Sequence, residues 1–487
     1  MTSQSPERTE AERREVCGGN DHGAGGVDER ADVERRAVCS RSAWLCSTPA
    51  SLSVHLQRSA ARHAPARRRD VDEIVETDER FQAEREHTDM ALNKLSIPLF
   101  CMASLVAGCP GDSPEEGDAA YAKLLQEGVD RVQASGIVAV HAEMLDGDRR
   151  IRARSGVAQR DSETPVDFES YFRMGSNTKT FVAVVVLQLA GEGALSLDDT
   201  VEQWLPGVVS GNGNDGSLIT IRQLLQHTSG LYDYIGPADP DGPDPQPSLA
   251  VLRSADEYMQ HRLDHMDAEE LVALALQHKP SFDPGTQWDY SNTNYVLAGM
   301  IIERATGNRW SEEVEARILD PLGLDHTFDP GDEPDLPAPH AVAYQQYEVD
   351  GPLIDVTIAN HTMAGAAGSL VTTTADLVKF WRALTEGSLL DPEQMAELHE
   401  TVPAPAFDPI APGTDYGLGI MWIPTSCGGG YWSHAGGTLG YSTRNAASDD
   451  GSRVIVMSLS TSTDDPEASY ATTIDTFKII DQLMCAD

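Results

Sequence analysis

The stretches that favour β-strands lie at both ends of this chain, and helical stretches lie between them. Residues 136–145 (GIVAVHAEML) and 150–158 are expected to form a hairpin, because an Asp-Gly-Asp turn separates them. Four further strands are expected near the other end, over residues 417–423, 430–433, 441–447 and 453–460. A strand set divided in this way predicts an α+β fold. We expect one antiparallel sheet built from both termini and flanked by helices, with a mainly helical subdomain inserted between them.

The chain carries a large excess of negative charge. It has 77 Asp and Glu residues against 36 Lys and Arg residues, which gives a formal net charge of −41 at pH 7. A field of this sign repels nucleic acid and anionic membrane surfaces, so neither is expected as a partner. With 487 residues, of which 40% are hydrophobic, the chain is long enough to bury a sizeable core.

The first part of the chain differs in character from the rest. Residues 1–89 are rich in Arg, Glu and Ala and lack sustained apolar periodicity, a composition typical of disorder. Residues 90–108 have the layout of a secretory signal, with Lys94 near the start, an apolar run and small residues at the end. The apolar run is too short for a membrane-spanning helix. We therefore interpret Met90 as the true start and residues 1–89 as an upstream extension.

A cysteine follows this signal-like segment. Residues 105–109 (LVAGC) resemble a bacterial lipoprotein box, in which the cysteine is lipidated and becomes the new N-terminus. The resemblance implies lipidation of Cys109, a tether over residues 109–120 that is rich in Pro, Gly, Asp and Glu, and a folded domain over residues 121–487. We expect an exported protein that is anchored to the bacterial cell envelope by its lipid alone.

The seven cysteines contain no C-x-x-C pair, so neither a zinc site nor a dense disulfide framework is indicated. A Cys427–Cys485 bridge would fit an oxidising compartment, but the sequence does not set its geometry and leaves this pairing open. His261 and His265 are four residues apart without an apparent third ligand, so no metal site is expected.

Ser176 stands at the start of a stretch that is apolar at helical spacing and that ends at two glycines, Gly191 and Gly193. On a helix, Lys179 lies one turn later on the same face, so its ammonium group can approach the serine hydroxyl. A serine and a lysine in an S-x-x-K pattern are a candidate nucleophile and its activating base. The pattern is common by chance, so its significance depends on partners elsewhere in the chain.

A second candidate group, Tyr290-Ser291-Asn292, precedes a predicted helix that ends at Gly307. A tyrosine phenol has a pKa of about 10 and is a poor base unless a cation stabilises its phenolate, which Lys179 can do. The side-chain NH2 of Asn292 can donate a hydrogen bond to a substrate amide carbonyl. Taken alone, Tyr290 is better explained as a half-buried aromatic residue at a helix start.

The third candidate group is the segment 433–441, SHAGGTLGY, which reads as a glycine-rich strand edge where backbone N–H groups can approach a ligand. The backbone amides of Ser176 and Gly437 can then form an oxyanion hole. His434 has an unperturbed pKa of about 6.5, which predicts partial charge at neutral pH. Taken alone, the segment is equally explained as a plain glycine-rich turn.

The chain contains S-x-x-K, Y-x-N and H-x-G in this order, together with connecting pieces such as ITIRQLLQHTSGLYDY and YSNTNYVLAGMIIERATG. In these features it resembles the class C β-lactamase-like serine hydrolase family over residues 133–480. The resemblance implies the same fold and no metal or organic cofactor. It makes Ser176 the acylated nucleophile, and Lys179 and Tyr290 the pair that handles its proton. The substrate-binding residues that it implies are Asn292, His434, Gly436, Gly437 and Thr438.

Within the family, the chain is most similar to the D-alanyl-D-alanine carboxypeptidases, because the third motif begins with His434 and not with lysine. This implies a penicillin-interactive hydrolase of D-alanyl-D-alanine-type peptides, with peptidoglycan as a partner. Ala435 and Gly437 replace threonines that such relatives carry, so a hydroxyl for the terminal carboxylate is missing, although Thr438 lies one residue on. This departure favours an ester or amide substrate. An esterase, a β-lactamase and a non-catalytic wall-binding lipoprotein remain the alternatives.

Overall fold

The computed structural model describes residues 116–236 and 249–486, with side chains from residue 119 onward. The predicted extension, the signal segment, Cys109 and most of the tether therefore lie outside the described residues. In the described ranges, no helix is both long enough and apolar enough to cross a membrane.

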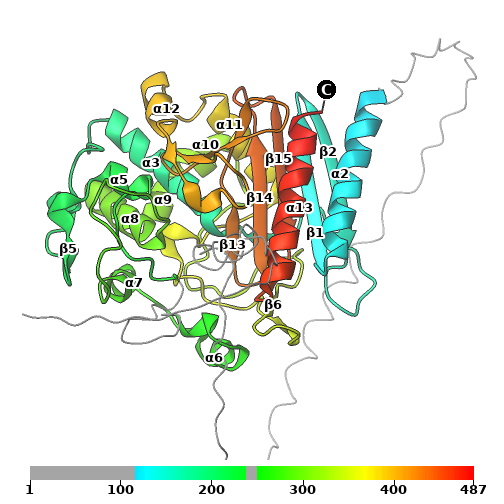
Figure 1. Cartoon of the computed structure of the whole chain (residues 1–487), viewed down its shortest axis with the longest axis horizontal. Helices are drawn as coiled ribbons and strands as arrows, with labels where there is room; N and C mark the ends of the chain where they lie inside the picture. Colours follow the sequence, from blue (N-terminus) through cyan, green and yellow to red (C-terminus); the bar gives the residue numbers. More distant parts are fainter. Residues whose placement is uncertain (1–115, 237–248, 487) are drawn as a thin grey trace, which may run out of the picture. The chain divides into compact units, whose positions relative to one another are not determined.

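The described residues are organised around a nine-stranded antiparallel sheet in the order β2-β1-β15-β14-β12-β11-β10-β9, with β13 paired to β14 (Figure 1). The N-terminal hairpin joins the C-terminal strands through β1 and β15, where Val140 lies opposite Leu459. The predicted α+β fold, with a sheet built from both ends of the chain, is thus confirmed. The strands are β1 (Ala139–Asp146), β2 (Arg149–Gly156), β9 (Val402–Pro403), β10 (Asp415–Tyr416), β11 (Met421–Pro424), β12 (Gly430–Ser433), β13 (Gly436–Thr438), β14 (Tyr441–Ala447) and β15 (Arg453–Leu459).

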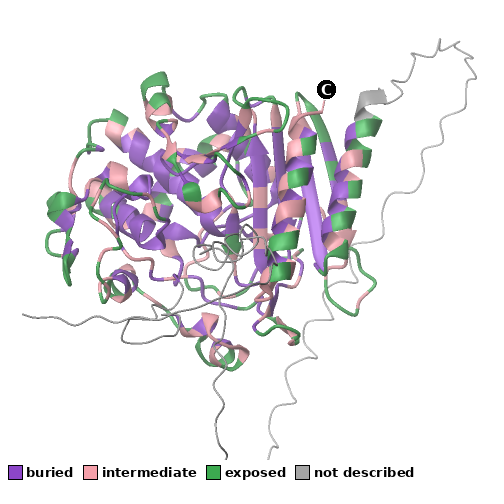
Figure 2. Ribbon diagram, in the orientation of Figure 1, coloured by how far each residue is buried: buried purple, intermediate pink, exposed green. Residues whose placement is uncertain are grey.

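Helices cover both faces of this sheet, because successive side chains of a strand point to opposite faces. Ile455 of β15 belongs to the core that α2 (Glu116–Ala134) and α13 (Pro466–Met484) complete. Its neighbour Val456 belongs to the larger core on the other side, which includes α11 (Thr374–Thr385). Figure 2 shows the central strands as almost continuously buried.

The middle of the chain supplies the predicted helical part. Its centre is α3 (Thr178–Gly191), which is buried along nearly its whole length because its residues are apolar on every side. The helix α8 (Asn292–Thr306) packs beside α3 and ends where Gly307 adopts a φ of +83°, a conformation that glycine accepts without strain. The other helices are α4 (Val201–Trp204), α5 (Ile221–Leu225), α6 (Ala255–His261), α7 (Ala268–Ala275), α9 (Trp310–Val314), α10 (Asp320–Leu322) and α12 (Pro392–Leu398).

Several elements differ from the prediction. The helix expected to start at Ser176 is preceded by a short 3-10 turn, η1 (Gly175–Asn177), and the α-helix itself starts at Thr178. The helix α5 follows a Thr220 cap and ends at Leu225, and His227 beyond it has a φ of +61°. The small sheets were not predicted from the sequence; they are formed by β3 (Phe172–Arg173) with β8 (Val371–Thr372), by β4 (Ser210–Gly211) with β5 (Asn214–Asp215), and by β6 (Tyr344–Gln346), β7 (Leu353–Asp355) and β16 (Thr461–Thr463).

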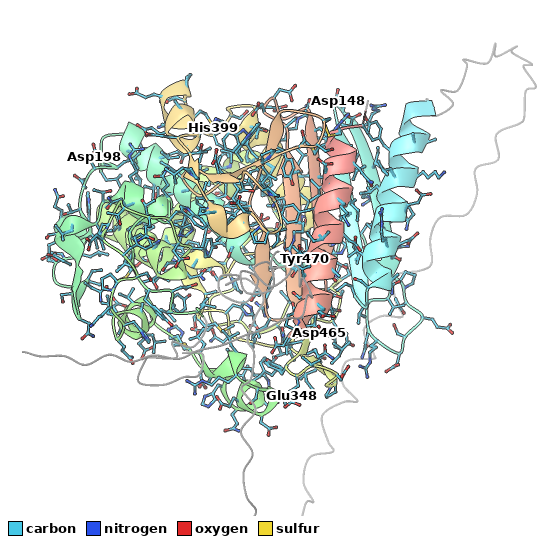
Figure 3. All side chains as sticks on the ribbon, in the orientation of Figure 1. Asp148, Asp198, Glu348, His399, Asp465 and Tyr470 are labelled. Atoms are coloured by element: carbon cyan, nitrogen blue, oxygen red, sulfur yellow. A yellow bond between two sulfur atoms is a disulfide. The ribbon has the colours of Figure 1, made fainter. Side chains whose placement is uncertain are left out.

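Several acidic residues lie on the surface. Asp148 projects from the β1–β2 turn, Asp198 precedes α4 and Glu348 lies between β6 and β7, and all three are exposed (Figure 3). Charges placed this way remain hydrated, so the strong negative charge of the chain is compatible with a compact core.

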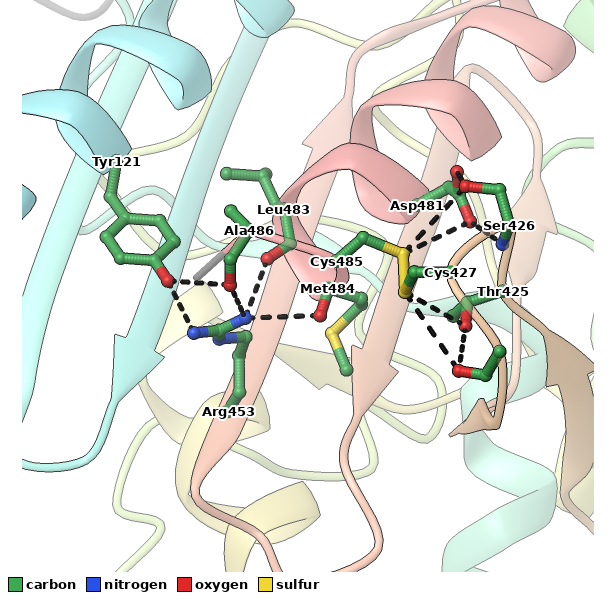
Figure 4. Close-up of a disulfide and its surroundings, with 11 residues drawn as sticks. Tyr121, Thr425, Ser426, Cys427, Arg453, Asp481, Leu483, Met484, Cys485 and Ala486 are labelled. Carbon is green, nitrogen blue, oxygen red and sulfur yellow. Dashed lines mark hydrogen bonds between the residues drawn. A yellow bond between two sulfur atoms is a disulfide. The ribbon is translucent and has the colours of Figure 1, made fainter.

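A disulfide joins the two cysteines whose pairing the sequence left open. Cys427 lies in the turn between β11 and β12, and Cys485 follows the last residue of α13 (Figure 4). Next to it, one guanidinium nitrogen of Arg453 donates to the carbonyl oxygens of Leu483, Met484 and Ala486 at 3.1, 3.1 and 2.7 Å. The end of α13 is therefore fixed to the sheet by both a covalent bond and hydrogen bonds.

Candidate active site

The turn η1 places Ser176 against the strand β13. Gly175, just before it, has a φ of +56°, and a Cβ on this residue would lie 2.8 Å from both the N and the O atom of Gly437. Only glycine allows so close an approach between the two backbones. Ser176 itself is 6% exposed, so its hydroxyl lies at the floor of the site.

Lys179 lies beneath Ser176 and has no exposed surface. Its Nζ is 3.0 Å from Ser176 Oγ, 2.7 Å from Asn292 Oδ1 and 2.6 Å from the carbonyl oxygen of Ala367. The amide and carbonyl oxygens can only accept hydrogen bonds. A neutral Lys179 therefore directs its two N–H bonds to these oxygens, and its lone pair faces the hydroxyl of Ser176.

Burial lowers the pKa of Lys179 well below its ordinary value, and the negative charge of Asp233 opposes this fall. A lysine whose pKa is lowered by desolvation can act as a general base near neutral pH. The lowered pKa and the contact with Ser176 are both compatible with Lys179 as the base that removes the proton of Ser176, and that role stays a prediction.

Tyr290 lies just before α8, with its ring centroid 5.0 Å from Lys179 Nζ. Burial raises the pKa of its phenol well above the ordinary value, while a hydrogen bond with Ser176 opposes the rise. The phenolate considered from the sequence is therefore disfavoured in the resting site. Tyr290 is therefore protonated beside Ser176, and its role in proton transfer stays a prediction.

Asn292 is the first residue of α8, and Asp233 holds its side-chain amide. The Nδ2 atom of Asn292 lies 3.1 and 3.0 Å from the two carboxylate oxygens of Asp233. Asp233 was not predicted as a site residue, although it lies between two tyrosines in the segment HTSGLYDY that carries part of the family resemblance. The NH2 group expected to bind a substrate carbonyl thus already has one protein partner, and the substrate contact stays a prediction.

His434 follows β12 and is fully buried. Its Nδ1 lies 2.7 Å from the carbonyl oxygen of Ala435, so Nδ1 carries the hydrogen and Nε2 accepts from the hydroxyl of Tyr416 at 2.9 Å. Burial, with a smaller contribution from Lys179, lowers the pKa of His434 to about 3. The partial charge expected from its unperturbed value is therefore wrong, and the imidazole is neutral at neutral pH.

The third motif is tied to the nucleophile by Asn445 of β14. Its Nδ2 donates to Asn177 Oδ1 and, at 2.8 Å, to the carbonyl oxygen of His434, while its Oδ1 accepts from the His434 N–H at 3.0 Å. Gly436 closes the gap, because a Cβ there would lie 1.9 Å from the carbonyl oxygen of Met174. These contacts hold β13 against η1, and the oxyanion hole formed by the Ser176 and Gly437 amides stays a prediction.

Thr438 uses its hydroxyl within the protein. Its Oγ1 lies 2.9 Å from His361 Nε2, and the other ring nitrogen, Nδ1, lies 3.2 Å from the carbonyl oxygen of Ala359. Burial lowers the pKa of His361 well below its ordinary value, so the ring is neutral. Because Nδ1 must donate to a carbonyl, Nε2 accepts the hydrogen of Thr438. This hydroxyl is therefore not available as a donor to a substrate carboxylate.

His227, which the sequence reasoning also did not single out, supports the tyrosine. It is fully buried, and its ring centroid lies 4.2 Å from that of Tyr290. Its Nδ1 accepts from the backbone N–H of Ser291 at 3.3 Å and from the side chain of Asn294 at 3.1 Å. The ring thus packs beneath Tyr290 and fixes the chain that leads into α8.

The two histidines considered as metal ligands have separate acidic partners. His261 pairs with Asp264 at 2.7 Å, and His265 pairs with Asp332 at 2.5 Å and with Asp267 at 3.1 Å. Over residues 119–236 and 249–486, no group of three or more His, Cys, Asp or Glu side chains is arranged to hold a metal ion.

Comparisons with known proteins identify the family and the fold. The family model described as Beta-lactamase matches residues 122–476. Penicillin-binding protein 4* of Bacillus subtilis is 27% identical over 61% of this chain and 62% of its own length, and esterase EstB of Burkholderia gladioli is 35% identical over 40% of this chain and 46% of its own. The chain thus spans less than two thirds of these curated relatives.

Among solved structures, a D-stereospecific amidohydrolase from Streptomyces sp. is 38% identical, with a TM-score of 0.66 over 75% of this chain and 98% of that one. The D-amino acid amidase of Ochrobactrum anthropi SV3, in complex with L-phenylalanine amide, is 26% identical, with a TM-score of 0.62 over 75% of this chain and 97% of that one.

Proposed function

The chain belongs to the beta-lactamase family, and from this premise we propose that it is a serine hydrolase that cleaves the amide bond following a D-configured residue through an acyl-enzyme on Ser176. The observation that carries the proposal is the position of Lys179 Nζ, 3.0 Å from Ser176 Oγ, with two carbonyl oxygens accepting its remaining hydrogens. The D-configuration is supported by the two amidohydrolases that share this fold.

The reaction begins with attack of Ser176 Oγ on the substrate carbonyl carbon. Lys179 accepts the hydroxyl proton, and the backbone amides of Ser176 and Gly437 receive the oxyanion. Tyr290 gives its phenolic proton to the leaving nitrogen and is reprotonated from Lys179, so the amine departs and the acyl ester remains. Water then attacks this ester, loses its proton along the same path, and releases the acid as Ser176 regains its hydrogen.

An amide is favoured over a peptide with a free terminal carboxylate. Gly437 has no side chain to bind a carboxylate, and the hydroxyl hydrogen of Thr438 is engaged by His361. His434, being neutral, offers no positive charge. We therefore propose D-amino acid amides as better substrates than D-alanyl-D-alanine peptides. β-Lactams and small esters are further proposed substrates of the same site.

The test compares D- and L-phenylalanine amide, a D-alanyl-D-alanine peptide and a nitrophenyl ester, together with labelling of Ser176 by a fluorophosphonate and by a fluorescent penicillin. We expect hydrolysis of the D-amide, a D over L preference of about a hundredfold or more, and an adduct that maps to Ser176. Equal rates on both enantiomers would contradict the D-specific part. Hydrolysis of the ester alone would indicate an esterase. If neither the fluorophosphonate nor the penicillin forms an adduct, the result would favour a non-catalytic wall-binding protein.

We further propose that the protein is exported and anchored by a lipid on Cys109. The support is the Cys427–Cys485 disulfide, since such bridges persist mainly outside the reducing cytosol. In a bacterial host, the wild-type protein is expected in the detergent phase of a Triton X-114 partition and the Cys109→Ala variant in the aqueous phase. Equal partitioning of the two forms would argue against the anchor.

A further inference from the structure

Asp233 lies beside Asn292, whose side-chain oxygen contacts Lys179. The carboxylate of Asp233 takes part in no step of the mechanism proposed above. Asp233 Oδ1 accepts hydrogen bonds from the backbone N–H groups of Ile235 and Asn292, both at 3.1 Å, and from Asn292 Nδ2, which also contacts Oδ2. Every one of these partners is a donor, as an ionised carboxylate requires. The group also lies at the first residue of the 15-residue helix α8, where the helix dipole favours a negative charge.

We propose that Asp233 is the positioning residue of the catalytic lysine: its carboxylate holds the amide of Asn292 in the orientation that leaves the lone pair of neutral Lys179 facing Ser176. This inference rests on the proposed acyl-enzyme function and adds to it a residue that does not touch the substrate.

The orientation of the Asn292 amide follows from what each neighbour can accept. The carboxylate of Asp233 only accepts hydrogen bonds, so the NH2 end of Asn292 must face it and the oxygen end must face Lys179. If the amide flipped, its oxygen would meet the carboxylate and its NH2 group would meet the lysine. Lys179 would then lose one of the two oxygens that fix its N–H bonds, and its lone pair would no longer be held toward Ser176.

Asp233 also affects the charge of Lys179 directly. As a residue Asp233 is partly exposed, yet burial of the carboxyl group raises its pKa while the hydrogen bonds from Ile235 and Asn292, together with Lys179, lower it. In the ionised form it stabilises the ammonium form of Lys179, opposing the effect of burial on the pKa of that lysine.

The other titratable groups around Lys179 and Asp233 do not change charge near neutral pH. Burial keeps the phenols protonated and the imidazoles neutral. These groups are His227, Tyr234, Tyr290, Tyr295, Tyr416 and His434. With Asp233 ionised, the acidic limb of a pH–rate profile on an uncharged substrate reports the deprotonation of Lys179, which must be neutral to act as a base.

The test is Asp233→Asn, assayed as kcat/KM against pH with an uncharged nitrophenyl ester, so that binding of a substrate cation plays no part. Removing the negative charge destabilises the ammonium form and lowers the pKa of Lys179. The acidic limb is thus expected to move to lower pH by about half a unit to one unit. Because the amide is free to flip, kcat/KM on the plateau is expected to fall by about tenfold or more.

The matched control is Asp148→Asn, which removes the same charge from a side chain that is 99% exposed in the β1–β2 turn. It is expected to leave both the limb and the plateau unchanged. A purely structural role for Asp233 would lower the melting temperature or the plateau without moving the limb, so an unmoved limb in a folded Asp233→Asn variant overturns the inference.

A charge exchange keeps the inference testable if Asp233→Asn does not fold. Asn292→Asp alone places two carboxylates face to face and is expected to lower the melting temperature. Adding Asp233→Asn restores one amide opposite one carboxylate, now directly against Lys179. The double variant is expected to regain thermal stability and to show an acidic limb above that of the wild type, whereas a limb at or below the wild-type position contradicts the inference. Failure of the wild type itself to label at Ser176 would instead reject the proposed function.

Discussion

We expect Ser176→Ala and Lys179→Met each to lower kcat by a factor on the order of a million. The double variant is expected to have the same kcat as either single variant. The two residues act as one unit, since the hydroxyl is a poor nucleophile until Lys179 Nζ, 3.0 Å away, accepts its proton. When residues act as a unit, losing one already removes nearly all that the pair contributes.

The measurement is kcat on an amide and on an ester, with fluorophosphonate labelling of each variant. Methionine is close to lysine in length and carries no charge, so Lys179→Met is expected to fold, and circular dichroism provides the check. Ser176→Ala loses only one oxygen atom and is expected to keep the wild-type melting temperature. A double variant that is a further thousandfold slower than both single variants would show that Ser176 and Lys179 do not share one step.

Gly436→Ala is expected to lower kcat by about two to three orders of magnitude and to lower the melting temperature. The added Cβ would lie 1.9 Å from the carbonyl oxygen of Met174 and 2.8 Å from Asn177 Nδ2. The first of these is a backbone atom just before the nucleophile turn, so β13 must move away from Ser176. The Gly437 amide then no longer lies where the oxyanion forms.

The matched comparison for stability is Gly437→Ala, one residue on. Its Cβ would have no heavy atom within 4 Å, because Gly437 faces the open side of the strand. Gly437→Ala is therefore expected to keep the wild-type melting temperature. If Gly436→Ala and Gly437→Ala lower the melting temperature equally, the close approach of Gly436 to Met174 is unimportant for stability.

Much of the architecture could be predicted from local patterns. The strands β12 (Gly430–Ser433) and β14 (Tyr441–Ala447) have the predicted bounds, because alternation and glycine turns are local signals. The helix α11 was not predicted as an element, although its segment contributes to the family resemblance. The 3-10 turn at Ser176 was also not predicted, since it depends on how closely Gly437 approaches Gly175.

The candidate site divides in the same way. The order of the three motifs identified Ser176, Lys179 and Tyr290 as candidates, and the structure brings these side chains into contact. Their protonation states could not be inferred from reference pKa values, and for His434 the inference was wrong. Desolvation depends on what surrounds a group, and for His434 this includes Tyr416 from another strand and Lys179 from a distant helix.

By itself, the sequence determined the fold class, the family resemblance and the candidate nucleophile, because periodicity, glycine positions and motif order are properties of the chain alone. The protonation states of these groups, and the residues that orient them, depend on contacts that form when the chain folds. Two groups set the direction of the Asn292 amide, Asp233 at a separation of 59 residues and Lys179 at a separation of 113 residues. Folding brings these side chains within hydrogen-bond distance of one another. Because the carboxylate of Asp233 cannot donate a hydrogen bond, the NH2 end of Asn292 faces Asp233 and its oxygen faces Lys179.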